Sequence, residues 1–184
     1  MEALYMLPFD ARHRTVHISQ GFNGPSSHFD LETKYGSSLD LTYAIDFALP
    51  FGTEVHAARG GCVFTVFTKS QTFYEGTDQN VGNNGFMITN IVVVQHIDTT
   101  YGLYAHLAYL SERVRIGQVV SQGEVLAVTG PSGWIGPMPH VHFMVYTRIP
   151  RPLVDGRPRA AKVVSMPFRF QNYQGSLEHQ IELD

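Results

Sequence analysis

Hydrophobic and polar residues alternate along this chain in short runs that turn-forming residues separate. The runs rich in β-branched and aromatic residues, which we expect to form strands, are 45–47, 54–58, 61–68, 87–96, 101–107, 124–129, 140–147 and a late strand near 166–172. Glycine and proline at their borders, as in 50–52 and 130–133, favour turns. No window has a sustained helical period. The pattern predicts a mainly β fold: antiparallel sheets with hairpins, long loops that form a groove, and little helix.

Two polar stretches, 29–39 and 70–85, are longer than ordinary hairpin loops, and we expect both to line a cleft. The proline-bearing tail from residue 148 predicts extended wrapping around the rest of the chain. The chain has 184 residues, of which 43% are hydrophobic, and we find no linker or internal repeat. We therefore expect a single domain over residues 1–184.

Composition excludes several classes of protein. A net charge of -3 gives no electrostatic case for binding nucleic acid or an anionic membrane. No stretch approaches the roughly 18 to 20 apolar residues that a membrane span needs, and residues 1–8 do not resemble a signal peptide. The single cysteine, Cys62, excludes an intrachain disulfide and a thiol-rich zinc knuckle. We expect Cys62 to be a small buried hydrophobic residue.

The most informative local pattern is His140-Val141-His142. In a strand, residues i and i+2 lie on one face about 7 Å apart, so both imidazoles can address one small volume. One can bind a metal while the other handles protons. Asp46 stands between Ile45 and Phe47 in an expected strand, where burial is costly unless a positive charge compensates it. A metal ion would supply this positive charge. The alternative is that Asp46 faces outward or makes an ordinary side-chain hydrogen bond.

His106 ends an alternating run in which Tyr104 and His106 would share a face. Taken alone, such a histidine is more often structural than catalytic. However, one cleft would explain His106, His140, His142, Asp46 and His28 together. A zinc hydrolase typically needs three protein ligands and an open fourth position for water.

Five segments resemble, in order, the lysostaphin-type (LytM-like) zinc endopeptidases of bacterial cell walls: YAIDFALPFGT (43–53), VHAARGG (55–61), YAHL (104–107), VRIGQVVSQG (114–123) and PHVHF (139–143). The resemblance covers about residues 16–147 and leaves 148–184 as a C-terminal extension of a single peptidase domain. It implies that Asp46 and His142 bind one zinc ion. It also implies that His106 and His140 orient water and, as imidazolium groups, offset charge on the tetrahedral intermediate.

The first zinc ligand departs from the commonest pattern of that family, in which a histidine stands four residues before the aspartate. Thr42 occupies this position here, and threonine is a poor zinc ligand. The segment 20–28 resembles a subgroup with an insertion between the two ligands, and it nominates His28. A loop histidine without a metal is the alternative interpretation.

The implied reaction is zinc-dependent hydrolysis of peptide cross-links or stem peptides of bacterial peptidoglycan, which makes a periplasmic or secreted location the expectation. A narrow groove would suit such peptides, and the residues that we expect to line it are Asn23, Tyr74, Tyr104 and Trp134. Trp134 is equally well interpreted as a hydrophobic plug of its loop.

Other functions remain as alternatives. A catalytically silent wall-binding or amidase-activating module of the same fold is one, although retention of all five candidate residues argues against it. Residues 116–124 resemble the paired-glycine turns of biotinyl and lipoyl carrier domains, but the three lysines, Lys34, Lys69 and Lys162, lie outside that setting. The 130–133 segment lacks a serine nucleophile elbow. We assign surface or structural roles to the remaining histidines, His13, His17, His56, His96 and His179.

Overall fold

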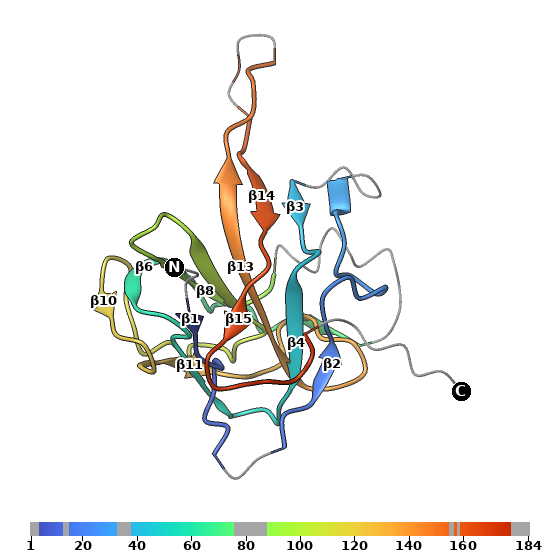
Figure 1. Ribbon diagram of the computed structural model, residues 1–184, viewed down its shortest axis with the longest axis vertical. Coiled ribbons are helices and arrows are strands. Elements are labelled where there is room, and N and C mark those ends of the chain that lie inside the picture. The colour runs from blue at the N-terminus through green and yellow to red at the C-terminus, as the bar shows by residue number, and fades with distance from the viewer. Residues whose placement is uncertain are drawn as a thin grey trace.

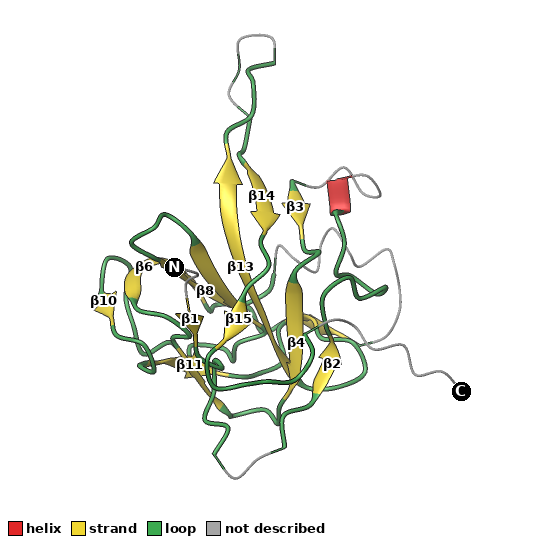
Figure 2. Cartoon of the chain, in the orientation of Figure 1, coloured by secondary structure: helices red, strands yellow, loops and turns green. Residues whose placement is uncertain are grey.

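The computed structural model describes residues 4–12, 15–32, 38–75, 88–154, 157 and 159–177. Within them the chain is mainly β, as predicted, with one short helical segment at 31–32 (Figure 2). The strands are β1 (Leu4–Tyr5), β2 (Ile18–Gln20), β3 (Leu39–Asp40), β4 (Ala44–Ala48), β5 (Glu54–His56), β6 (Gly61–Phe67), β7 (Phe73–Tyr74), β8 (Ile91–Gln95), β9 (Tyr101–Ala105), β10 (Val119–Val120), β11 (Val125–Val128), β12 (Gly133–Trp134), β13 (His140–Ile149), β14 (Lys162–Ser165) and β15 (Arg169–Phe170).

The largest sheet has nine strands and is organised around β13. Its main path is β10-β6-β8-β9-β13-β14-β3, and β4 also pairs with β13 and with β2. The first half of β13 lies between β9 and β4, whereas its second half continues with β14 into a projecting two-stranded arm (Figure 1). Most pairings are antiparallel, and β14 pairs with β3 in parallel. Since β13 is held on both sides, side chains on its first half have fixed positions.

The two faces of β13 carry different residues because a strand alternates its side chains with period two. Val141, Phe143 and Val145 belong to the main hydrophobic core, together with Ile45 and Phe47 of β4. The opposite face carries His140 and His142 and continues into Met144 and Tyr146, which belong to a smaller core. Asp46 of β4 is opposite His142 in the ladder. The antiparallel register therefore brings a carboxylate and an imidazole together on one face.

The two ends of the chain complete the main core. Tyr5 on β1 and Phe170 on β15 are buried in it, and the two strands pair in parallel. The C-terminal tail does more than wrap around the core, because it contributes β14 as well as the expected late strand.

Cys62 is exposed, contrary to our expectation, because its neighbour Val63 takes the inward-facing position of β6. Among the described helical residues, no segment has the length and apolarity needed to cross a membrane.

Candidate metal centre

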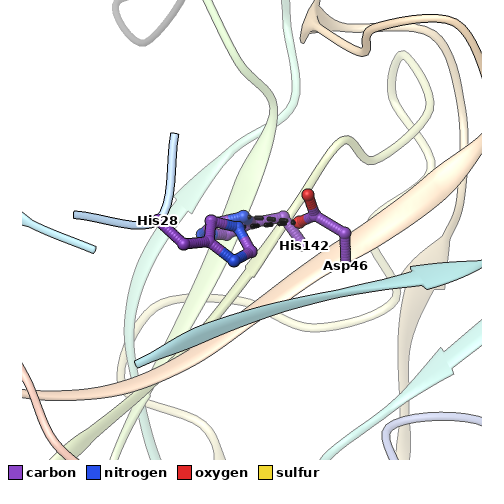
Figure 3. Close-up of side chains that lie close together, drawn as sticks. All are labelled: His28, Asp46 and His142. Atoms are coloured by element: carbon purple, nitrogen blue, oxygen red, sulfur yellow. Dashed lines mark hydrogen bonds and ion pairs between the residues drawn. The ribbon is translucent and has the colours of Figure 1, made fainter. Parts of the chain in front are cut away.

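Three predicted ligands, His28, Asp46 and His142, lie together in the structure (Figure 3). One potential ligand atom from each of them lies within 4.8 Å of those of the other two. His28 comes from the loop that follows β2, Asp46 from the middle of β4 and His142 from β13. All three side chains are buried. The fold thus gathers two imidazoles and one carboxylate that are far apart in the sequence.

The carboxylate oxygen Oδ1 of Asp46 is the centre of this group. It lies 2.8 Å from Nδ1 of His142, 3.4 Å from Nε2 of His28 and 3.8 Å from Nε2 of His140. Burial opposes ionisation of Asp46, but attraction to His28 and His140 and the hydrogen bond to His142 outweigh it. They hold the pKa of Asp46 well below its usual value. Asp46 therefore presents a negative charge to the surrounding nitrogens.

The His28 ring is oriented for a cation. Its Nδ1 donates a hydrogen bond of 2.8 Å to the carbonyl of Gly21, which directs Nε2 toward Asp46. Nε2 is buried and makes no hydrogen bond with any residue that the structure describes. A buried nitrogen that makes no hydrogen bond costs free energy, and a metal ion bound between Nε2 and Oδ1 of Asp46 would remove that cost. The residues present therefore fit a divalent cation, with His28 offering Nε2.

His142 contributes a ring nitrogen to the same group. Nδ1 faces Oδ1 of Asp46, and burial lowers the pKa of His142 against the opposing effect of Asp46. Two imidazoles, which bind a metal in their neutral form, and one carboxylate form a donor set typical of zinc hydrolase sites. His28, Asp46 and His142 could thus hold zinc through two nitrogens and one oxygen.

His106 and His140 form a pair beside this group, with ring centroids 4.5 Å apart. Nδ1 of His106 donates to the carbonyl of Ser132 at 2.7 Å, and Nδ1 of His140 donates to that of Met138 at 2.9 Å. Each bond leaves Nε2 available for other chemistry. Burial and the neighbouring histidines lower the pKa of His106 to about 3. With its pKa lowered in this way, His106 is a neutral imidazole near pH 7.

A left-handed backbone turns His106 toward the site. Strand β9 ends at Ala105, and His106 has a φ of +59°. Strand alternation consequently stops there, and His106 does not share a face with Tyr104. Tyr104 lies fully buried in the main core, where its hydroxyl accepts a 2.7 Å hydrogen bond from the amide of Ala58. The expectation that Tyr104 lines a groove is thus corrected.

Tyr74 and Trp134, two other expected groove residues, are neighbours in the parallel ladder of β7 and β12. Tyr74 is 37% exposed and Trp134 is half-buried. Trp134 follows two residues after Ser132, whose carbonyl orients His106. Asn23 is exposed in the loop that leads to His28, with a left-handed φ of +58°. Of the two loops expected to line the cleft, residues 33–37 and 76–85 lie outside the described part of the chain.

Two polar residues near the site were missed by the sequence reasoning. Gln20 hydrogen-bonds the second oxygen of Asp46. Asn90 is fully buried, and its side chain joins the carbonyls of Ser70 and Leu107. Gln20 is the first residue of the 20–28 segment that nominated His28, but its contact with Asp46 depends on the pairing of β2 with β4. Asn90 belongs to no motif that the sequence reasoning used.

Comparison with known proteins shows the family. Residues 40–152, more than half of the chain, match Peptidase family M23, and the chain belongs to this family, as the lysostaphin-type resemblance predicted. No curated protein matches the sequence. Among solved structures, a zinc-containing peptidase from Vibrio cholerae is 26% identical with a TM-score of 0.51; the match covers 86% of this chain and 39% of that one. This chain thus spans well under half of the Vibrio protein's length.

Two further structures share the fold at lower identity. A mutant catalytic domain of the prophage-encoded M23 protein EnpA from Enterococcus faecalis is 20% identical with a TM-score of 0.51, over 78% of this chain and 87% of that one. A chain of the SpoIIQ–SpoIIIAH pore-forming complex is 16% identical with a TM-score of 0.50, over 91% and 94% of the two chains. Since one of them belongs to a pore-forming complex, the fold alone does not establish catalysis.

Proposed function

We propose that this protein is a zinc-dependent endopeptidase that cleaves peptide cross-links or stem peptides of bacterial peptidoglycan. The observation that carries the proposal is the buried group of His28, Asp46 and His142, with His106 and His140 beside it. Membership of a peptidase family supports the reaction class. A silent module of the same fold would have no need to keep these five side chains in one place.

In the proposed mechanism, His28 and His142 offer nitrogens and Asp46 offers Oδ1 to one zinc ion. When bound, zinc would supply Lewis-acid chemistry, which polarises water and the scissile carbonyl. His106 is neutral, and its Nδ1 proton is committed to Ser132, so Nε2 can accept a proton from the attacking water. The leaving amine needs this same proton, and His106 can return it directly or through Nε2 of the neighbouring His140, whose ring centroid lies 4.5 Å away.

The peptide is proposed to lie against Tyr74 and Trp134, the partly exposed aromatic residues that pair across β7 and β12. Trp134 lies two residues after Ser132, whose carbonyl orients His106. Asn23 is a third proposed contact. Residues 1–184 are proposed to act as one peptidase domain, because strands near both ends enter the same core. A peptidoglycan substrate places the proposed activity outside the cytoplasmic membrane, in the periplasm or the cell wall.

The direct test is mass analysis of purified muropeptides after incubation with the zinc-loaded protein. We expect new peptide fragments that are absent when a chelator is added and absent with His140→Ala. The fragment masses would identify the bond. Intact muropeptides in every arm, although zinc is bound, would contradict the proposal and favour the silent wall-binding module.

A further inference from the structure

Gln20 lies between the two segments that carry His28 and Asp46. It is the last residue of β2, is 7% exposed and is opposite Asp46 in the ladder. Its Nε2 donates to Oδ2 of Asp46 at 3.1 Å and to the hydroxyl of Ser27 at 2.9 Å. Its Oε1 accepts from the amides of Ser26 at 3.0 Å and Ser27 at 3.2 Å. These contacts use both donors and both acceptor positions of the amide.

The contacts give the two oxygens of Asp46 different surroundings. Oδ1 faces His142 and His28, whereas Oδ2 is held by Gln20. A hydrogen bond to one carboxylate oxygen fixes the rotation of the group and leaves the other oxygen for a cation. Without Gln20, either oxygen or both could turn toward the imidazoles.

The same side chain holds the loop that presents His28. Oε1 binds two successive amides, Ser26 and Ser27, directly before this histidine. In the commonest family pattern, a spacing of four residues links the first histidine to the aspartate. Thr42 stands at that position here, so a side-chain connection replaces the missing short link.

We infer that Gln20 is a positioning residue of the metal centre: it selects the Asp46 oxygen offered to the cation and fixes the loop that carries His28. The inference rests on the proposed zinc site. It assigns a role to a residue that touches neither substrate nor metal.

Gly24 allows the position of Gln20 to be tested without changing Gln20 itself. A Cβ atom at position 24 would lie 2.2 Å from Cγ and 2.7 Å from Cδ of Gln20. If the stem of Gln20 moved away, its amide would lose its hydrogen bonds to Asp46 on one side and to Ser26 and Ser27 on the other. Gly24→Ala should therefore displace Gln20 without changing any polar group.

The test is the zinc dissociation constant, measured by competition with a chromophoric chelator. Gln20→Met keeps the buried volume and removes the polar contacts, so we expect affinity to fall by about 10- to 100-fold. Gly24→Ala should also lower the zinc affinity. The matched control is Gln171→Ala, because Gln171 is exposed and, among the described residues, the one hydrogen bond of its side chain is a 3.5 Å contact with Gln122. Its zinc affinity should equal that of the wild type.

A second readout separates positioning from simple loss of stability. Urea unfolding of the zinc-free proteins would establish the folded fraction, and affinity is then compared for folded protein only. Replacing zinc by cobalt reports ligand geometry, and we expect Gln20→Met to change the visible absorption bands while Gln171→Ala leaves them unchanged. A residue with a merely structural role would lower stability and leave both the affinity and the bands as they were.

The outcomes distinguish this inference from the proposed function. If the wild type binds zinc and His28→Ala does not, but folded Gln20→Met has wild-type affinity and an unchanged cobalt spectrum, the role of Gln20 is overturned while the metal site stands. If the folded wild type itself binds no zinc, both the inference and the proposed function are overturned.

Discussion

His28 and Asp30 are two residues apart, yet they belong to two very different groups of charges. The inner group surrounds Asp46 with His28, His140 and His142 and is buried. The outer group pairs Asp30 and Glu32 with Lys162 and Arg151 near the protein surface. Lys162 lies 2.8 Å from Asp30 and 2.9 Å from Glu32.

The two groups differ in the side chains that balance the charge of their carboxylates. Lysine and arginine are permanently charged near neutral pH, so the outer carboxylates are already balanced. Among the described residues, the ion pairs of Asp46 all involve histidine, whose charge depends on a proton that a metal can displace. Water weakens the outer pairs, whereas burial strengthens the inner ones. A carboxylate encircled by imidazoles thus indicates a cation site, and one encircled by lysine and arginine indicates a surface contact.

The largest effect is expected from Asp46→Asn, which removes the negative charge of the inner group. Zinc affinity should fall by more than the roughly 10- to 100-fold cost of losing an outer-shell partner, and muropeptide cleavage should disappear with it. Metal analysis after dialysis measures the first and mass analysis of muropeptides the second. Asp30→Asn is the matched control and should keep its zinc. Full zinc occupancy in Asp46→Asn would remove the basis for separating the two groups.

Next in size is the effect of His106→Ala, which leaves the three proposed ligands in place. We expect turnover to fall by about 100- to 1,000-fold, because a proton-transfer group is lost. Zinc content should be nearly unchanged, as should that of His140→Ala. Loss of zinc from His140→Ala equal to that from His142→Ala would instead make His140 a ligand.

A buried histidine outside both groups gives a smaller, pH-dependent effect. His96 is 3% exposed, and burial lowers its pKa although its Nδ1 hydrogen-bonds the carbonyl of Gly60. Below the unfolded-state pKa of about 6.5, the unfolded chain therefore binds a proton that the folded chain excludes, and stability falls as pH falls. Urea unfolding of zinc-free protein between about pH 7 and 5 should show a shallower dependence for His96→Gln than for the wild type. Parallel curves would contradict this.

The smallest effect is expected in the outer group. Lys162→Met should lower the free energy of unfolding by less than about 1 kcal/mol, because Asp30 and Glu32 are partly exposed. Raising the salt concentration should shrink the difference further. Urea unfolding at low and high salt measures both, and zinc affinity serves as the second readout. A weaker affinity would mean that the outer group also holds the loop of His28.

The sequence predicted the parts of this molecule that follow from local alternation and from family motifs. Asp46 and His142 occupy strand positions whose neighbours are plainly hydrophobic, so their shared polar face could be anticipated. Tyr104 could not be placed, since the left-handed turn at His106 is not visible in an alternating run. Gln20 was missed because its importance depends on the register between β2 and β4, a long-range property. Strand β14 was missed because a proline-rich stretch precedes it.

The pairing of β1 with β15 sets a limit on how small this protein can be made. A fragment cut at the edges of the family resemblance, residues 16–147, would lose Tyr5 and Phe170, which fill the space behind Phe143 and Phe47. It would also lose Leu177, whose carbonyl receives the amide of Phe22 in the loop leading to His28. Deletion from either end would therefore disturb the positions of the proposed ligands. A shortened protein for expression or domain grafting must keep β1, β15 and the residues up to Leu177.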